Sequence, residues 1–233
     1  MMHRDRTRSR RAFLALAGGT LVNIGLPGSF MRVADAEQQV LEASTRPDGR
    51  PRLPPGQTAV KKILNMGGTP GTATIADWTL RVHGEVEKPI VLSYQELLEL
   101  EQVQIVCDIH CVTGWTLLDS QWGGVRLSTI MNKAKPRRQG AFIIFEAAAG
   151  YTSNVPISEA QKEDVILAHS FFGEQLPRAH GAPVRVMVPD RYLYKSAKWL
   201  EAVKVSSRDE PGFYESMGYS NSADPWKQER LQR

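Results

Sequence analysis

The pattern of apolar and polar positions predicts short strands with a few helices between them. Trp78, Leu80 and Val82 alternate with polar residues, which is the pattern of a half-buried strand. Further strands are predicted at 103–107, 141–145, 184–188 and 200–205. A loop is expected at 108–115, directly after the strand at 103–107.

Helix-start signals separate these strands. Ser93 and Glu96 form a capping box at the start of a short helix. Ser128 is expected to cap a second helix that ends near Ala134, and another capping box is predicted to begin at Ser158. Short helices between irregularly spaced strands indicate an α+β domain with a mixed sheet rather than a regular βαβ array.

Positive charge is concentrated at the N-terminus. The chain has 233 residues, with 29 basic and 25 acidic side chains and a formal net charge of +4. Residues 1–36 hold six arginines and two aspartates, which leaves 23 basic and 23 acidic residues in the rest. The main body is therefore neutral, and a nucleic-acid partner is not expected.

The same N-terminal residues have the layout of an export signal. An arginine-rich start precedes an apolar stretch at 12–24 and the small-x-small pattern Ala34–Ala36. The run Ser9–Leu14, with consecutive arginines, resembles the twin-arginine signal of the bacterial Tat machinery. We expect a signal peptide at 1–36, a proline-bearing arm or linker at 37–57 and one domain at 58–233, located in the periplasm.

The densest chemistry lies between Cys107 and Trp115. The two cysteines of the chain are four residues apart, with His110 beside the second. This segment alone is compatible with three interpretations. The cysteines could be buried structural thiols, a redox pair, or part of a zinc site with Cys107, His110 and Cys111 as ligands. The zinc site lacks a fourth ligand, and the spacing is CxxxC rather than CxxC.

Four ordered motifs carry a family resemblance. Cys111-x-Thr-Gly-Trp is followed by Trp122–Leu127, then by the run His180–Arg185 and by Ser196–Trp199. Together they resemble the sulfite oxidase family of molybdenum enzymes over about residues 60–230. The resemblance implies a sulfite oxidase-type molybdopterin-binding domain and a molybdenum–molybdopterin cofactor.

The resemblance also implies roles for individual residues. Cys111 would be the thiolate ligand of the metal, which suits the preference of molybdenum for soft sulfur donors. Cys107 receives no ligand role, and Ala149 stands where the family often has an acidic residue. The other expected cofactor-binding residues are Asn65, Thr113, Asn154, His180, Arg185, Ser196 and Lys198.

Two-electron oxygen-atom transfer on a small sulfur- or nitrogen-oxo substrate is the implied reaction. Vertebrate-type members carry an arginine five positions after the metal-binding cysteine, where this chain has Thr116. This argues against a sulfite site unless Arg191 or another arginine reaches it, and Trp115 instead resembles the periplasmic methionine sulfoxide reductase type. The alternatives are a sulfite dehydrogenase that passes electrons to a cytochrome and a non-catalytic binding module.

His110 and either Tyr192 or Tyr194 are candidate proton donors in the substrate pocket. A histidine pKa suits proton transfer near neutrality. No CxxCH haem motif occurs in the sequence. We therefore expect a separate electron-transfer partner, either a cytochrome or a quinone-linked membrane subunit.

Overall fold

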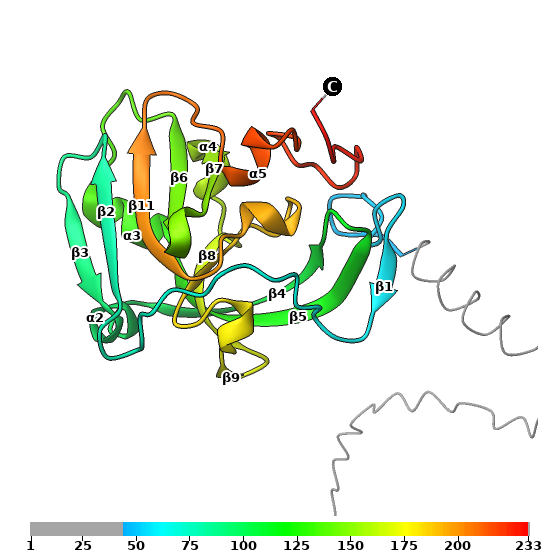
Figure 1. The fold of residues 1–233 in the computed structure, drawn as a ribbon, viewed down its shortest axis with the longest axis horizontal. Coiled ribbons are helices and arrows are strands. Elements are labelled where there is room, and N and C mark those ends of the chain that lie inside the picture. Colours follow the sequence, from blue (N-terminus) through cyan, green and yellow to red (C-terminus); the bar gives the residue numbers. More distant parts are fainter. Residues whose placement is uncertain (1–43, 233) are drawn as a thin grey trace, which may run out of the picture.

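The computed structural model describes residues 44–232, which form two sheets joined by short helices (Figure 1). The predicted signal peptide and the first part of the predicted arm lie outside these residues. Within the described part, no helix is long and apolar enough to cross a membrane. The predicted α+β class with mixed sheets is confirmed, since parallel and antiparallel pairs occur in both sheets.

The six-stranded sheet is built around the long strand β5, which pairs with β1, β4 and β8. The pair β1–β5 is parallel and the others are antiparallel. This sheet positions the cysteine segment, because β4 and β5 form the hairpin that contains it. Its strands are β1 (Thr58–Val60), β4 (Gln102–His110), β5 (Trp115–Arg126), β8 (Ile166–Phe171), β9 (Glu174–Gln175) and β10 (Arg185–Met187).

The five-stranded sheet has the order β3-β2-β11-β6-β7. In β2, Leu80 and Val82 are buried and their neighbours Thr79 and Arg81 are exposed, which confirms the predicted alternation. Its strands are β2 (Thr79–Gly84), β3 (Ile90–Ser93), β6 (Phe142–Ala147), β7 (Thr152–Pro156) and β11 (Leu200–Ser206).

The helices are short. The capping box at Ser93 and Glu96 is confirmed. The predicted cap at Ser128 is wrong, because buried Leu127 continues directly from β5 and Arg126 occupies the N-cap without a side-chain bond. The capping box predicted at Ser158 is also wrong, since the helix starts at Ile157 and Pro156 occupies the N-cap. The helices are α2 (Tyr94–Leu98), α3 (Leu127–Ala134), α4 (Ile157–Ala160) and α5 (Phe213–Ser216), with 3-10 turns η1 (Ala148–Gly150), η2 (Arg178–His180) and η3 (Leu193–Lys195).

The loop predicted at 108–115 is shorter than expected. Strand β4 continues to His110 and β5 begins at Trp115, so four residues make the turn. Further along β5, a Cβ added at Gly124 would lie 2.1 Å from the Leu167 carbonyl oxygen. Glycine is therefore required at this position, where β5 pairs with β8.

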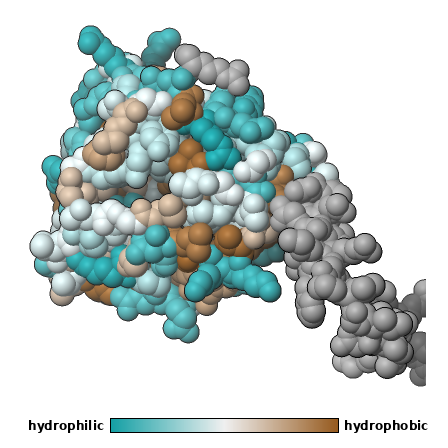
Figure 2. All heavy atoms as spheres, turned by 45° about the vertical axis from the view of Figure 1, so that its right-hand side comes forward, coloured by the Kyte–Doolittle hydropathy of each residue, from teal (hydrophilic) through white to brown (hydrophobic). Residues whose placement is uncertain are grey.

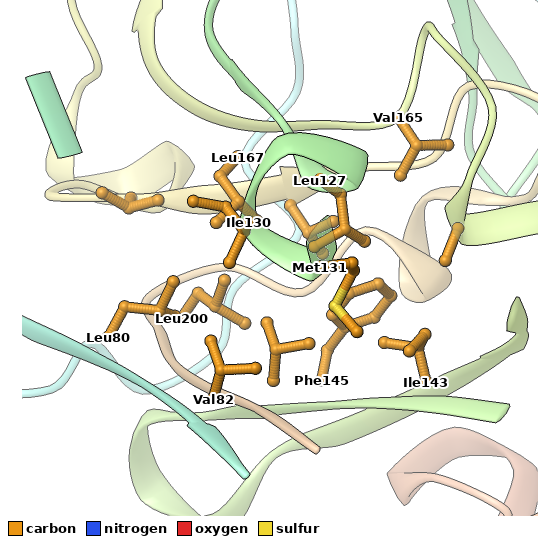
Figure 3. Close-up of a cluster of buried hydrophobic side chains, with 14 of the residues drawn as sticks. Leu80, Val82, Leu127, Ile130, Met131, Ile143, Phe145, Val165, Leu167 and Leu200 are labelled. Carbon is orange, nitrogen blue, oxygen red and sulfur yellow. The ribbon is translucent and has the colours of Figure 1, made fainter. Parts of the chain in front are cut away.

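The six-stranded sheet buries both of its faces. Adjacent residues Leu167 and Ile166 on β8 belong to different apolar clusters, as strand alternation requires. One cluster fills the space between the two sheets and includes α3 (Figure 3). The other cluster contains Cys111 and Trp115, so the segment predicted to carry the chemistry is supported by its own core.

Truncation of Phe145, in the apolar cluster between the two sheets, should lower the free energy of unfolding strongly. Its side chain is fully buried among Val82, Ile143 and Met131 between the sheets (Figure 3). We expect Phe145→Ala to lower the free energy of unfolding by about 3–5 kcal/mol, measured by urea denaturation. Val91→Ala, on an exposed side chain of β3, should change it by less than about 0.5 kcal/mol. Equal losses in both variants would contradict this core assignment.

Residues 44–57 of the predicted arm are packed on the domain. Arg46 and Arg50 both contact Asp190, and Arg52 pairs with Asp108 at the end of β4. Leu53 is buried. This segment lies beside the C-terminal tail and β1 (Figure 1). On the face seen in Figure 2, apolar residues form small patches bordered by hydrophilic ones.

Candidate cofactor site

The turn between β4 and β5 presents the Cys111 thiol. The Cys111 amide donates to the Trp115 carbonyl (2.8 Å), and the Gly114 amide donates back to the Cys111 carbonyl (3.0 Å). Gly114 has a φ of +106°, a conformation that favours glycine. The Cys111 sulfur lies 3.1 Å from the Thr113 hydroxyl. The tight turn therefore fixes the direction of the thiol at the start of β5.

This thiol lines a cleft of about 300 Å³. The cleft collects segments that are far apart in the sequence: the loop at 63–69, the cysteine turn, the β6–β7 connection, the η2–β10 region, the run 193–199 and the α5 region. Its walls are largely aromatic and apolar. The residues that line it include Met66, Cys111, Thr113, Trp115, Tyr151, His180, Arg185, Tyr194, Ser196, Lys198, Tyr214 and Tyr219.

Arg185 is a buried cation without an acidic partner. Its guanidinium, 3% exposed, donates to the carbonyls of His180 (2.9 Å) and Ser196 (2.8 Å). No carboxylate lies within ion-pair distance of it among residues 44–232. Burial lowers its pKa to about 10. An uncompensated buried charge is costly, so the site is suited to an anionic ligand.

Lys198 adds a second unpaired cation to the cleft. Its ammonium donates to the carbonyls of Gly67 and Ala179 and lies 4.2 Å from the Trp199 ring centre. Burial, together with the positive charge of Arg185, lowers its pKa to about 8. Burial and the same two cations also lower the pKa of His180. An anion bound between these like charges would stabilise their protonated forms.

The structure brings together six of the eight residues predicted to bind the cofactor: Cys111, Thr113, His180, Arg185, Ser196 and Lys198. The Ser196 hydroxyl accepts from the Val188 backbone amide (2.9 Å), so this side chain also links the run 193–199 to the residue after β10. Asn65 is not among the lining residues. Its side chain accepts from the Gly67 amide (3.0 Å) and shapes the loop that does line the cleft.

Asn154 lies elsewhere, on a second cavity of about 710 Å³. Its side chain bonds to Asp209 and Asn221 and accepts from the Lys195 ammonium (2.7 Å). Lys195 in turn forms a fully buried ion pair with Glu215. Every hydrogen-bonding group of Asn154 is thus used inside the protein, and the structure does not bring this residue to the cleft.

His110 and Tyr192 are also outside the cleft lining. His110 is the last residue of β4, whereas Cys111 lies in the turn that follows and lines the cleft. The ring is fully buried, with Nδ1 2.9 Å from the Thr116 hydroxyl and its centre 5.1 Å from that of Trp226. Burial lowers the His110 pKa to about 4. The ring is therefore neutral near pH 7, and the side chain is not placed to protonate a substrate.

The zinc and redox interpretations of the cysteine segment gain no support. No group of three or more His, Cys, Asp or Glu side chains among residues 44–232 is arranged to hold a metal ion. Cys107 and Cys111 are both free thiols in the structure. Burial raises the pKa of the Cys107 thiol to about 12, so it stays protonated.

Comparison with known proteins gives the family. Residues 66–214 match the model of the oxidoreductase molybdopterin-binding domain. The chain is 36% identical over 182 residues to the uncharacterized oxidoreductase YuiH of Bacillus subtilis, covering 77% of this chain and 92% of that protein. The chain belongs to the molybdopterin-binding oxidoreductase family. The predicted resemblance, enzyme class and molybdenum–molybdopterin cofactor are thereby confirmed.

More distant proteins are also similar to this chain. The catalytic subunit of the protein-methionine-sulfoxide reductase MsrP of Xanthomonas axonopodis pv. citri is 26% identical over 189 residues, 70% of this chain and 58% of that one. The chain thus spans little more than half of MsrP. The sulfane dehydrogenase SoxCD of Paracoccus pantotrophus shares the fold, with a TM-score of 0.54 and 23% identity over 58% of this chain and 40% of that one.

The described residues fit the cofactor. The unpaired cations Arg185 and Lys198 suit the phosphate end of a pterin, and the Cys111 thiol offers the soft donor that molybdenum prefers. The sequence motifs did not identify the aromatic wall residues Tyr151 and Tyr214. They come from separate segments without a shared pattern, so only the fold brings them together.

Proposed function

We propose that this oxidoreductase catalyses two-electron oxygen-atom transfer on a small, uncharged sulfur- or nitrogen-oxide. The observation that carries the proposal is the charge distribution in the cleft. Its unpaired cations, Arg185 and Lys198, belong to the region suited to phosphate, while Cys111 is surrounded by neutral and aromatic side chains. When bound, the molybdenum centre supplies the oxygen-atom transfer chemistry.

Among residues 44–232, no cation beside Cys111 is directed into the cleft, because Arg230 at the cysteine turn donates to the Val112 and Gly56 carbonyls and does not line the cleft. Thr116 is fully buried and hydrogen-bonded to His110, on the side of β5 away from the cleft. Arg191 is engaged elsewhere, because its guanidinium pairs with Glu159 (2.7 Å) and donates to the Ser222 carbonyl (3.2 Å). Neither residue can attract an anion into this cleft, which favours a neutral substrate.

Trp115 supports the same proposal. Its indole faces the cleft and donates to the Met66 sulfur (3.4 Å), so the wall beside the cysteine turn is apolar. Thr113 lies within hydrogen-bond distance of the Cys111 sulfur and orients it. The names of similar proteins include a methionine-sulfoxide reductase subunit, whose substrate class fits such a wall.

The proposal includes export and an electron partner. Residues 1–36 have the twin-arginine pattern, so the chain would reach the periplasm already folded and loaded with cofactor. The sequence has no CxxCH motif, and a separate cytochrome or quinone-linked membrane subunit would exchange electrons with the site.

A substrate panel on the purified, cofactor-loaded protein tests the reaction. Methionine sulfoxide and other S- and N-oxides would be offered with a reduced dye, and sulfite with an oxidised dye. We expect turnover of at least one neutral oxide, with kcat/KM at least about tenfold above that for sulfite, equivalent to about 1.4 kcal/mol. Activity with sulfite alone would overturn the proposal, and Cys111→Ser serves as the inactive control.

A further inference from the structure

Both ends of the described chain meet at the cysteine turn. Three carbonyl groups of the turn, those of Cys111, Val112 and Gly114, point toward segments outside the hairpin. The Gln57 amide donates to the Cys111 carbonyl (3.1 Å), and the Thr58 backbone amide donates to the Gly114 carbonyl (2.9 Å). The Arg230 guanidinium donates to the Val112 carbonyl. Residues distant in sequence thus fix the backbone on which the thiol is mounted.

Gln57 is itself held in one orientation. Its side-chain oxygen accepts from the Thr116 hydroxyl (3.4 Å), while its nitrogen donates to the Cys111 carbonyl. Gln57 is 4% exposed. Its backbone amide donates to the Pro54 carbonyl and closes a turn. One buried amide therefore bridges strand β5 and the cysteine turn.

Arg230 bridges the turn and the arm. Besides the Val112 carbonyl, its guanidinium donates to the Gly56 carbonyl (3.1 Å) and lies 5.5 Å from the Tyr192 ring centre. Among residues 44–232 it forms no ion pair with a carboxylate. The planar fork of an arginine matches two neighbouring carbonyl groups in a way that an ammonium does not.

The arm and the tail also hold each other. The Trp226 indole donates to the Pro51 carbonyl (2.8 Å), and the Arg50 guanidinium lies 3.8 Å from the Trp226 ring centre. Arg50 is anchored to Asp190 on the domain. Release of either segment would therefore remove donors from the cysteine turn.

We propose that Gln57 and Arg230 are positioning residues for Cys111, so that the two ends of the domain together set the direction of the proposed metal ligand. This inference rests on Cys111 being that ligand, as the proposed function requires. Groups that orient a metal ligand commonly change metal affinity by about 10–100-fold when they are removed.

The test uses the cofactor-loaded full-length protein and its Gln57→Leu, Arg230→Met and Arg230→Lys variants. Arg208→Met, an exposed arginine without an ion pair among residues 44–232, is the matched control. The readouts are the thiolate-to-metal charge-transfer band, molybdenum retained on dialysis, and hydrogen exchange of peptides covering 108–116 and 200–206.

We expect a shifted band, at least about tenfold greater molybdenum loss and faster exchange at 108–116 in Gln57→Leu and Arg230→Met. Exchange at 200–206, in β11, should stay unchanged, which separates a local effect from unfolding. Arg230→Lys should recover part of the effect, and Arg208→Met should match the wild type.

Wild-type bands and molybdenum retention in both Gln57→Leu and Arg230→Met would overturn the inference, as would equally faster exchange in both peptides. These results leave the proposed function intact if Cys111→Ser still alters the band. A band that is unchanged in Cys111→Ser would instead remove the ligand assignment, and this inference with it.

Discussion

Replacement of Cys111 by serine should lower turnover by more than about 100-fold and leave the protein folded. Removal of a group that merely orients a metal ligand costs about 10–100-fold, so loss of the ligand itself should cost more. Serine is close in size to cysteine, but it replaces the soft thiolate sulfur with a hard oxygen donor. Turnover and urea unfolding of the purified variant would be measured together.

Cys107→Ser is the matched control for this substitution. Its sulfur lies 3.8 Å from the Ser120 hydroxyl on the neighbouring strand, away from the cleft lining. Burial raises the pKa of this thiol, and its sulfur is not placed to reach a metal held in the cleft. Turnover close to the wild type is expected. Equal losses in both variants would contradict the assignment of Cys111 as the ligand.

Arg185→Met should lower the molybdenum content of the purified protein by at least about tenfold. A charge-assisted hydrogen bond contributes about 1.5–3 kcal/mol, and about 1.4 kcal/mol corresponds to a factor of ten in affinity. Lys198 lies in the same cleft but is a point charge, so it cannot replace the planar guanidinium. Elemental analysis of the purified variant gives the result directly.

Arg185→Met should change the stability of the cofactor-free protein only slightly. Removal of a buried, unpaired cation stabilises the cofactor-free protein, whereas the carbonyls of His180 and Ser196 lose a donor. These effects oppose each other, so the free energy of unfolding should change by less than about 2 kcal/mol. Arg81→Met, on an exposed side chain of β2, is the control. Full molybdenum content in Arg185→Met would contradict the role of this cation.

Local sequence was sufficient for the parts of the site that lie on motifs. The turn at Cys111 and the run from His180 to Lys198 were predicted because their motifs resemble the sulfite oxidase family, and the structure brings them to one cleft. The local path of the chain explains why His110 is not in the cleft. His110 is the last residue of β4 and is buried beside Thr116 and Trp226, whereas Cys111 lies in the turn that follows and lines the cleft.

Other misses reflect tertiary contacts. Asn154 lies on β7, where Asp209 and Asn221 occupy its hydrogen-bonding groups and keep it at the second cavity. Gln57 and Arg230 come from opposite ends of the chain, and neither stands in a motif. Their meeting at the cysteine turn depends on the packing of arm and tail, which no local pattern predicts.

X-ray absorption at the molybdenum edge of the cofactor-loaded protein tests the central claim most directly. The account predicts that Cys111→Ser has one sulfur scatterer fewer around the metal than the wild type, while Cys107→Ser keeps the full set. The same sulfur shell in the wild type and in Cys111→Ser would show that this thiol is not a ligand, and would contradict the account.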